Sequence, residues 1–166
     1  MATVRQFPCL APSFLSTHPT YNVPEAATQT YKQGALLAIS AGYAQELATN
    51  GALIVGFAAA PGMNLTTAGT AQGAFDGLAK IIPALPHVQF EMNIDSAGTL
   101  GAYTSLVTNI GSSYGVTKDS NGVWYIDVDK TGGIARVIVT GFRDPIGTVG
   151  ARVFCVVRYS TSLFGS

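Results

Sequence analysis

Ser113 stands in the stretch whose spacing is closest to that of a hydrolase nucleophile. Residues 111–115 read Gly-Ser-Ser-Tyr-Gly and match G-x-S-x-G. In such enzymes the serine lies on a strand-to-helix turn, and an acid and then a histidine follow it along the chain. Both histidines, His18 and His87, precede Ser113, and the residues after it have the pattern of a strand and a hairpin. We therefore expect an ordinary loop and no enzyme, and keep a small hydrolase using Ser113 as the least favoured alternative.

Two aspartates open a stretch that resembles the start of a calcium loop. Asp127 and Asp129 have the alternate spacing of such ligands, but the twelfth position, which must be a bidentate glutamate, is Ile138. We expect both aspartates on the solvent face of a strand. His18 and His87 lack the neighbouring ligands that a zinc site requires, and no glycine loop precedes a helix as phosphate binding demands. The sequence predicts no metal and no cofactor.

Charged side chains are scarce in this chain. They make up 11% of its 166 residues, hydrophobic residues make up 48%, and the net charge is zero, whereas soluble domains carry about 25% charged residues. Much of the surface must therefore consist of small and apolar groups, which suits a protein covered by a partner. Lysines and arginines do not cluster, so we expect no direct binding of nucleic acid.

The compartment is also constrained by the sequence. The first 30 residues lack a basic stretch followed by an unbroken apolar run, and no apolar stretch reaches the length of about 20 residues that spans a membrane. Cys9 and Cys155 lie in different contexts, and we expect both to be reduced. These features predict a protein that is neither secreted nor inserted in a membrane.

Residues 1–30 have the composition of an extended N-terminal arm. Prolines at positions 8, 12, 19 and 24 fix the backbone and break any helical or strand period. The arm is nevertheless apolar, unlike a disordered tail. Seven side chains are the predicted partner-binding residues, namely Val4, Phe7, Leu10, Phe14, Leu15, Tyr21 and Val23. They can lie on the same chain or on another subunit, and the low charge favours another subunit.

Residues 31–166 have the pattern of a β-rich domain. Alternating or continuous apolar runs separated by turns predict strands near 36–39, 52–57, 88–94, 123–128, 134–140 and 152–159, with a weaker one near 103–107. Residues 88–94 alternate as in a strand with one buried face. Phe75, Leu78, Ile81 and Ile82 predict one short helix stopped by Pro83. The strand spacing favours a compact β-barrel or sandwich with at most that helix.

Several of these segments also resemble the capsid decoration (cement) proteins of tailed bacteriophages. The segments are 31–37, 51–58, 114–117, 124–127, 136–139 and 150–154, and the resemblance covers roughly residues 31–159. It implies a β-barrel or β-tulip-like domain, often trimeric, whose extended termini bind the major capsid protein on the outside of an icosahedral shell. It thus implies a structural virion protein made in the host cytoplasm and forming homo-oligomers, with a trimer favoured and a dimer possible. A tail-tube, connector or other ring-forming virion subunit is the alternative.

Overall fold

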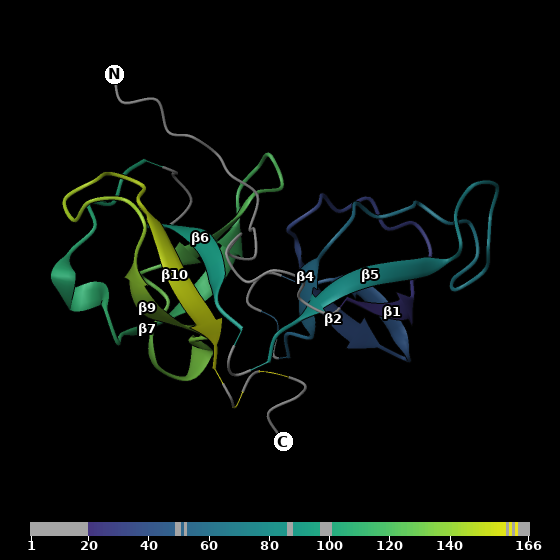
Figure 1. Cartoon of the computed structure of the whole chain (residues 1–166), viewed down its shortest axis with the longest axis horizontal. Coiled ribbons are helices and arrows are strands. Elements are labelled where there is room, and N and C mark those ends of the chain that lie inside the picture. The colour runs from purple at the N-terminus through teal and green to yellow at the C-terminus, as the bar shows by residue number, and fades with distance from the viewer. Residues whose placement is uncertain are drawn as a thin grey trace.

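The computed structural model describes residues 20–48, 51, 53–85, 88–96, 101–158, 160 and 162. This part of the chain contains ten strands in two groups of five, which form the two lobes in Figure 1. The mainly β fold and the β-barrel are thereby confirmed. The helical elements within the described ranges are the two 3-10 turns η1 (Val107–Asn109) and η2 (Gly132–Ile134).

The first group forms an antiparallel N-terminal sheet. Its strands are β1 (Tyr21–Pro24), β2 (Leu36–Ser40), β3 (Tyr43–Glu46), β4 (Gly56–Ala58) and β5 (Leu78–Pro83), in the spatial order β1-β5-β4-β2-β3. Glu25, directly after β1, forms a bridge to Ala44 in β3. The two edge strands therefore approach each other, and the sheet curls toward closure.

The second group forms a closed barrel. Its strands are β6 (Phe90–Asp95), β7 (Ser113–Lys118), β8 (Trp124–Asp127), β9 (Val137–Phe142) and β10 (Arg152–Val157), in the order β10-β6-β8-β7-β9. The pair β6 and β8 is parallel, and the other neighbours are antiparallel. Closure pairs both sides of every strand, so the barrel offers no open edge to another chain.

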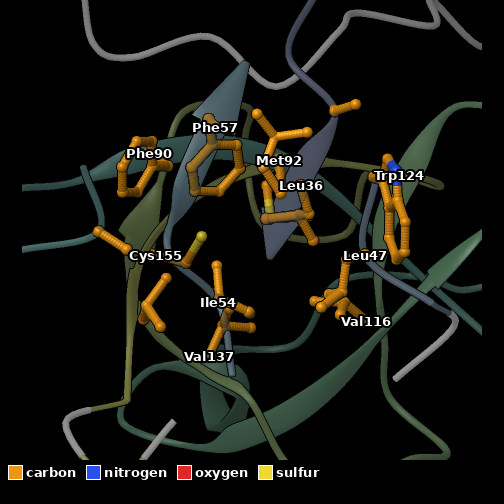
Figure 2. Close-up of a cluster of buried hydrophobic side chains, with 14 of the residues drawn as sticks. Leu36, Leu47, Ile54, Phe57, Phe90, Met92, Val116, Trp124, Val137 and Cys155 are labelled. Atoms are coloured by element: carbon orange, nitrogen blue, oxygen red, sulfur yellow. The ribbon is translucent and has the colours of Figure 1, made fainter. Parts of the chain in front are cut away.

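One hydrophobic core connects the two lobes. The buried apolar side chains of the sheet and of the barrel form a single cluster, part of which is shown in Figure 2. Phe57 of β4 stacks on Phe90 of β6 with ring centroids 3.7 Å apart. Elsewhere between the lobes, Glu46 of β3 accepts hydrogen bonds from Lys118 at 2.8 Å and from the Trp124 indole at 3.1 Å. The lobes thus share apolar and polar contacts.

The short helix predicted from Phe75 to Ile82 is wrong, because residues 78–83 form β5. Ala79, Ile81 and Pro83 are buried while Lys80 between them is exposed, which is the two-residue alternation of a strand. β5 pairs with β1 on one side and with β4 on the other. These tertiary pairings outweigh the local spacing that suggested a helix.

The prediction that residues 88–94 have only one buried face is also wrong. All six residues of β6 are buried. Phe90, Met92 and Ile94 belong to the core cluster, and the polar side chains that alternate with them bind loops that cover the outside of the barrel. The solvent-facing position predicted for Asp127 is wrong for a related reason, because its carboxylate is buried and accepts a hydrogen bond from Thr117 at 2.9 Å.

Candidate protein interface

Two loops that are distant in sequence lie together at one end of the barrel. Residues 103–105 and 147–150 are joined by backbone hydrogen bonds, including one from Ser105 to Thr148 of 3.1 Å and one from Gly150 to Tyr103 of 2.9 Å. Thr104 and Val149 form an isolated bridge. This short ladder is what the structure has in place of the weak strand predicted near 103–107, and it makes the two loops one surface.

The carboxylate of Asp95, at the end of β6, organises the first loop. It is fully buried, and the hydrogen bonds it accepts from described residues all come from uncharged backbone groups. It accepts backbone N–H groups from Ser96, Gly101, Ala102 and Tyr103. Four donors on one carboxylate fix the path of the chain into the ladder, since each would cost free energy if left unpaired. Asn93, two residues earlier, donates to the Gly150 carbonyl at 2.9 Å and holds the second loop.

Glu91, two residues before Asn93, completes this face of β6. It accepts a hydrogen bond from Arg143 at 2.6 Å, and Arg152 lies 3.6 Å from its other oxygen. Arg152 also donates to both oxygens of Asp144, which lies at the start of the second loop. Hydrogen bonds from the Arg152 side chain hold the pKa of Asp144 below its usual 3.8, and the same pairing raises the pKa of Arg152. The second loop is therefore clamped at its base by paired charges.

Asn109 determines which side chains of the first loop face outward. It is buried, its side-chain oxygen accepts the N–H of Leu106 at 2.7 Å, and its amide nitrogen donates to the hydroxyls of Tyr103 at 2.9 Å and Tyr114 at 2.8 Å. These bonds hold Asn109, the last residue of η1, inside the protein. Leu106 and Val107 before it and Ile110 after it are left at the surface.

The result is an exposed apolar area that we name the barrel-end patch. Its side chains are 40% to 61% exposed and come from both loops, namely Leu106, Val107, Ile110, Ile146 and Val149. Residues 104–111 and 145–149 contain no charged side chain. In Figure 1 the coil of η1 and the loop between β9 and β10 lie at the end of the barrel away from the N-terminal sheet. A patch of this kind, held rigidly, is typical of a protein contact surface.

The predicted partner-binding residues lie elsewhere or outside the described part. Val4, Phe7, Leu10, Phe14 and Leu15 belong to residues 1–19, which the structure does not describe. Tyr21 and Val23 lie in β1, where Tyr21 is half exposed and Val23 packs against the core. The structure does not bring them to the barrel-end patch, and sequence reasoning missed the patch. The signal available was the presence of large apolar residues in segments rich in turn-forming residues.

The segments considered for catalysis and metal binding have structural roles in the described residues. Ser113 begins β7 and pairs with Ile138 of β9, so no strand-to-helix turn presents it. Asp127 forms an ion pair with Lys130 at 3.4 Å beside its hydrogen bond from Thr117. The described ranges hold no group of three or more His, Cys, Asp or Glu side chains arranged to bind a metal. His18 and His87 lie outside those ranges.

A hollow of about 260 Å³ lies in the N-terminal sheet. Glu25, Met63, Phe75 and Lys80 are among its lining residues. Glu25 is fully buried and is bonded to the Tyr31 hydroxyl at 2.6 Å and to the Met63 N–H at 2.7 Å. The hollow is smaller than the roughly 300–1,000 Å³ of most small-molecule sites, and its carboxylate is engaged in holding the sheet together.

Comparison with known proteins found no match to this chain among family models, curated proteins or solved structures. Over the residues that the structure describes, no helix has the length and hydrophobicity needed to cross a bilayer.

Proposed function

We propose that this chain is a structural virion protein that binds the outer surface of an icosahedral phage capsid and cements neighbouring major capsid subunits. It acts without catalysis, as a homo-oligomer for which a trimer is favoured, and it uses its N-terminal arm and the surface of its domain. The site of action is the exterior of the virion.

The observation that carries this proposal is the barrel-end patch. Leu106, Val107 and Ile146 are each more than half exposed, yet the loops beneath them are held by buried side chains of β6 and by Asn109. A rigid apolar surface binds a protein with a small loss of conformational entropy, because its side chains are ordered before contact. A cement protein requires such a surface, since it gains free energy only by burying area across the joints of the shell.

The charge of the chain supports the same reading. With nine acidic and nine basic side chains in 166 residues, the protein has no long-range attraction for packaged DNA and little charge to desolvate at a contact. Many weak contacts repeated by the symmetry of a shell then add to a strong overall attachment.

Binding to capsids that lack this chain tests the proposal. The intact protein should co-sediment with such shells, and Val107→Asp should weaken binding about tenfold or more, because a charge would be buried in an apolar contact. Ile134→Asp is the matched control, because Ile134 is also exposed, at 45%, but lies outside the patch. Ile134 belongs to η2, which precedes β9, whereas residues 145–149 of the patch follow β9 at its other end. Failure of the intact protein to bind shells contradicts the proposal, and rings or tubes formed by the free protein favour the alternative of a ring-forming virion subunit.

A further inference from the structure

We infer that Asn121 is a site of self-modification, where the protein converts an asparagine into aspartate and isoaspartate with the assistance of Lys32. Asn121 lies in the turn between β7 and β8 of the barrel, and Gly122 follows it. Lys32 lies between β1 and β2, in the N-terminal lobe. The inference goes beyond the proposed function and does not depend on it, because the reaction involves only the chain and water.

The reaction begins at the backbone nitrogen of Gly122. After loss of its proton, this nitrogen attacks the side-chain amide carbon of Asn121, and a bond forms between the two atoms. The bond from that carbon to the amide nitrogen breaks, and the nitrogen leaves as ammonia with the equivalent of the lost proton. A solvent water then opens the cyclic imide at either of its two carbonyl carbons. One opening gives aspartate, and the other gives isoaspartate, whose main chain runs through the former side chain.

The turn leaves the reacting groups accessible. Ser120 and Asn121 are exposed. Beyond its two chain neighbours, no described residue has an atom within 4 Å of the point where a side chain on Gly122 would begin. Gly122 has a φ of 78°, a conformation that suits a residue without a Cβ. The approach of its nitrogen to the Asn121 amide carbon is therefore unhindered by a side chain.

Asp119 holds the backbone of the turn more firmly than it holds the Asn121 side chain. Its Oδ1 accepts the N–H of Asn121 at 2.9 Å and that of Val123 at 2.7 Å. The Asn121 side-chain amide donates to its Oδ2 at 3.4 Å, which is a long bond. The Gly122 N–H donates to the Asp119 carbonyl at 3.1 Å, and this bond must open before the attack. Local opening of an exposed turn costs little free energy, so neither bond blocks the reaction.

Lys32 assists the loss of the proton from Gly122. Its ammonium donates to the Asn121 carbonyl oxygen at 2.7 Å, and that oxygen belongs to the same peptide group as the Gly122 N–H. When the N–H loses its proton, the negative charge lies largely on this oxygen, where a bound cation stabilises it. Lys32 therefore raises the population of the nucleophilic nitrogen. The contact joins residues 89 positions apart, so it is a property of the folded chain.

The products alter the contact that promotes them. Each conversion adds one carboxylate beside Asp119, in a chain whose net charge is zero. In isoaspartate the former main-chain carbonyl that Lys32 binds becomes a free carboxylate, and the main chain of the turn is longer by one carbon. Conversion of Asn121 thus changes both the charge and the geometry of a contact between the N-terminal lobe and the barrel.

Incubation of the full chain at neutral pH, followed by mass spectrometry, tests the inference. Cleavage by trypsin after Lys118 and Lys130 releases a peptide, 119–130, in which Asn121 is the only amide side chain. Conversion of an amide to an acid in this peptide is therefore assigned to Asn121. Lys32→Met keeps the apolar stem and removes the charge, and it should slow the conversion about threefold or more. Lys32→Arg keeps a cation and should retain most of the wild-type rate.

Two controls separate the contact from general effects of the substitution. Asn50-Gly51 is the other Asn-Gly pair in the sequence, and its conversion rate should be the same in the three proteins. In urea, the wild type and Lys32→Met should convert Asn121 at equal rates, because unfolding removes the contact with Lys32.

Two outcomes overturn the inference. One is an equal or faster conversion of Asn121 in folded Lys32→Met than in the folded wild type. The other is a folded wild type whose Asn121 is unchanged when the chain in urea has fully reacted. Neither measurement involves shells, so the capsid proposal stands or fails by its own experiment.

Discussion

A few buried polar side chains position the loops that expose apolar residues at the barrel-end patch. Glu91, Asn93 and Asp95 alternate along β6, and each binds a loop that covers the outside of the barrel. Asn109 turns inward in the same way and leaves its apolar neighbours outside. Movement of a loop would break the hydrogen bonds that these buried side chains make, so together they favour one arrangement of the loops. The exposed patch is thus a product of the polar side chains behind it.

Replacement of Asp144 by asparagine should remove the pair between Asp144 and Arg152 that holds the second loop. The contribution of this pair to the free energy of unfolding should depend on pH. The hydrogen bond to Arg152 lowers the pKa of Asp144 in the folded protein, so its contribution is present above the unfolded value of about 3.9 and is lost as the pH falls through the lower folded value. At pH 7, Asp144→Asn should reduce the free energy of unfolding by about 1 kcal/mol, because the pair is partly solvated. Urea unfolding of the wild type and of Asp144→Asn at pH 7 and near pH 2.5 gives the loss of unfolding free energy at each pH. An equal loss at the two pH values would contradict a stabilising role of the ionised Asp144 carboxylate.

The sequence predicted the positions of many of the strands. Period-two patterns placed the strands later found as β6, β8, β9 and β10, because a barrel interior selects alternate apolar residues. The patterns could not show what covers the other face. Glu91 looks like a solvent residue in the sequence, and it is buried because Arg143 and Arg152, more than 50 positions away, close over it. The patch was missed for the same reason, since its exposure depends on loops brought together by barrel closure.

The described end of the predicted arm is part of the N-terminal sheet. Residues 21–24 form β1, and Glu25 bonds to Tyr31 and to the Met63 backbone in the interior of that sheet. Burial, and then the hydrogen bond to Glu25, raise the pKa of Tyr31 well above its ordinary value. An arm that can be removed without damage must therefore end before residue 20.

Two truncations should behave differently. Deletion of residues 1–19 should leave a cooperatively folded protein, because no described strand is removed. Deletion of residues 1–30 should cost about 3 kcal/mol or more, since it removes the strand paired with β5 and leaves the Met63 N–H and the Tyr31 hydroxyl without their acceptor. Thermal unfolding followed by circular dichroism compares the two. Equal stability of both truncations would show that β1 contributes nothing to the sheet.

At the scale of the whole molecule, the two lobes share one core. Phe57 comes from the N-terminal sheet and Phe90 from the barrel, and their stacked rings lie within a cluster that includes strands of both (Figure 2). Glu46 of the sheet also accepts hydrogen bonds from Lys118 and Trp124 of the barrel. The sheet and the barrel are therefore packed as one unit.

This shared core predicts one unfolding transition for both lobes. Phe90→Ala should cost about 3–5 kcal/mol, because it removes a fully buried ring and leaves a cavity against Phe57. Phe75→Ala is the matched control, since that ring is 49% exposed in the N-terminal lobe, and it should change stability by less than about 0.5 kcal/mol. Fluorescence of Trp124, the single tryptophan, reports on the barrel, and hydrogen exchange of β2 amides reports on the sheet. Because the core is continuous, both probes should shift together in Phe90→Ala. A barrel that unfolds while the β2 amides stay protected would mean that the lobes are energetically independent and that the stacked rings do not couple them.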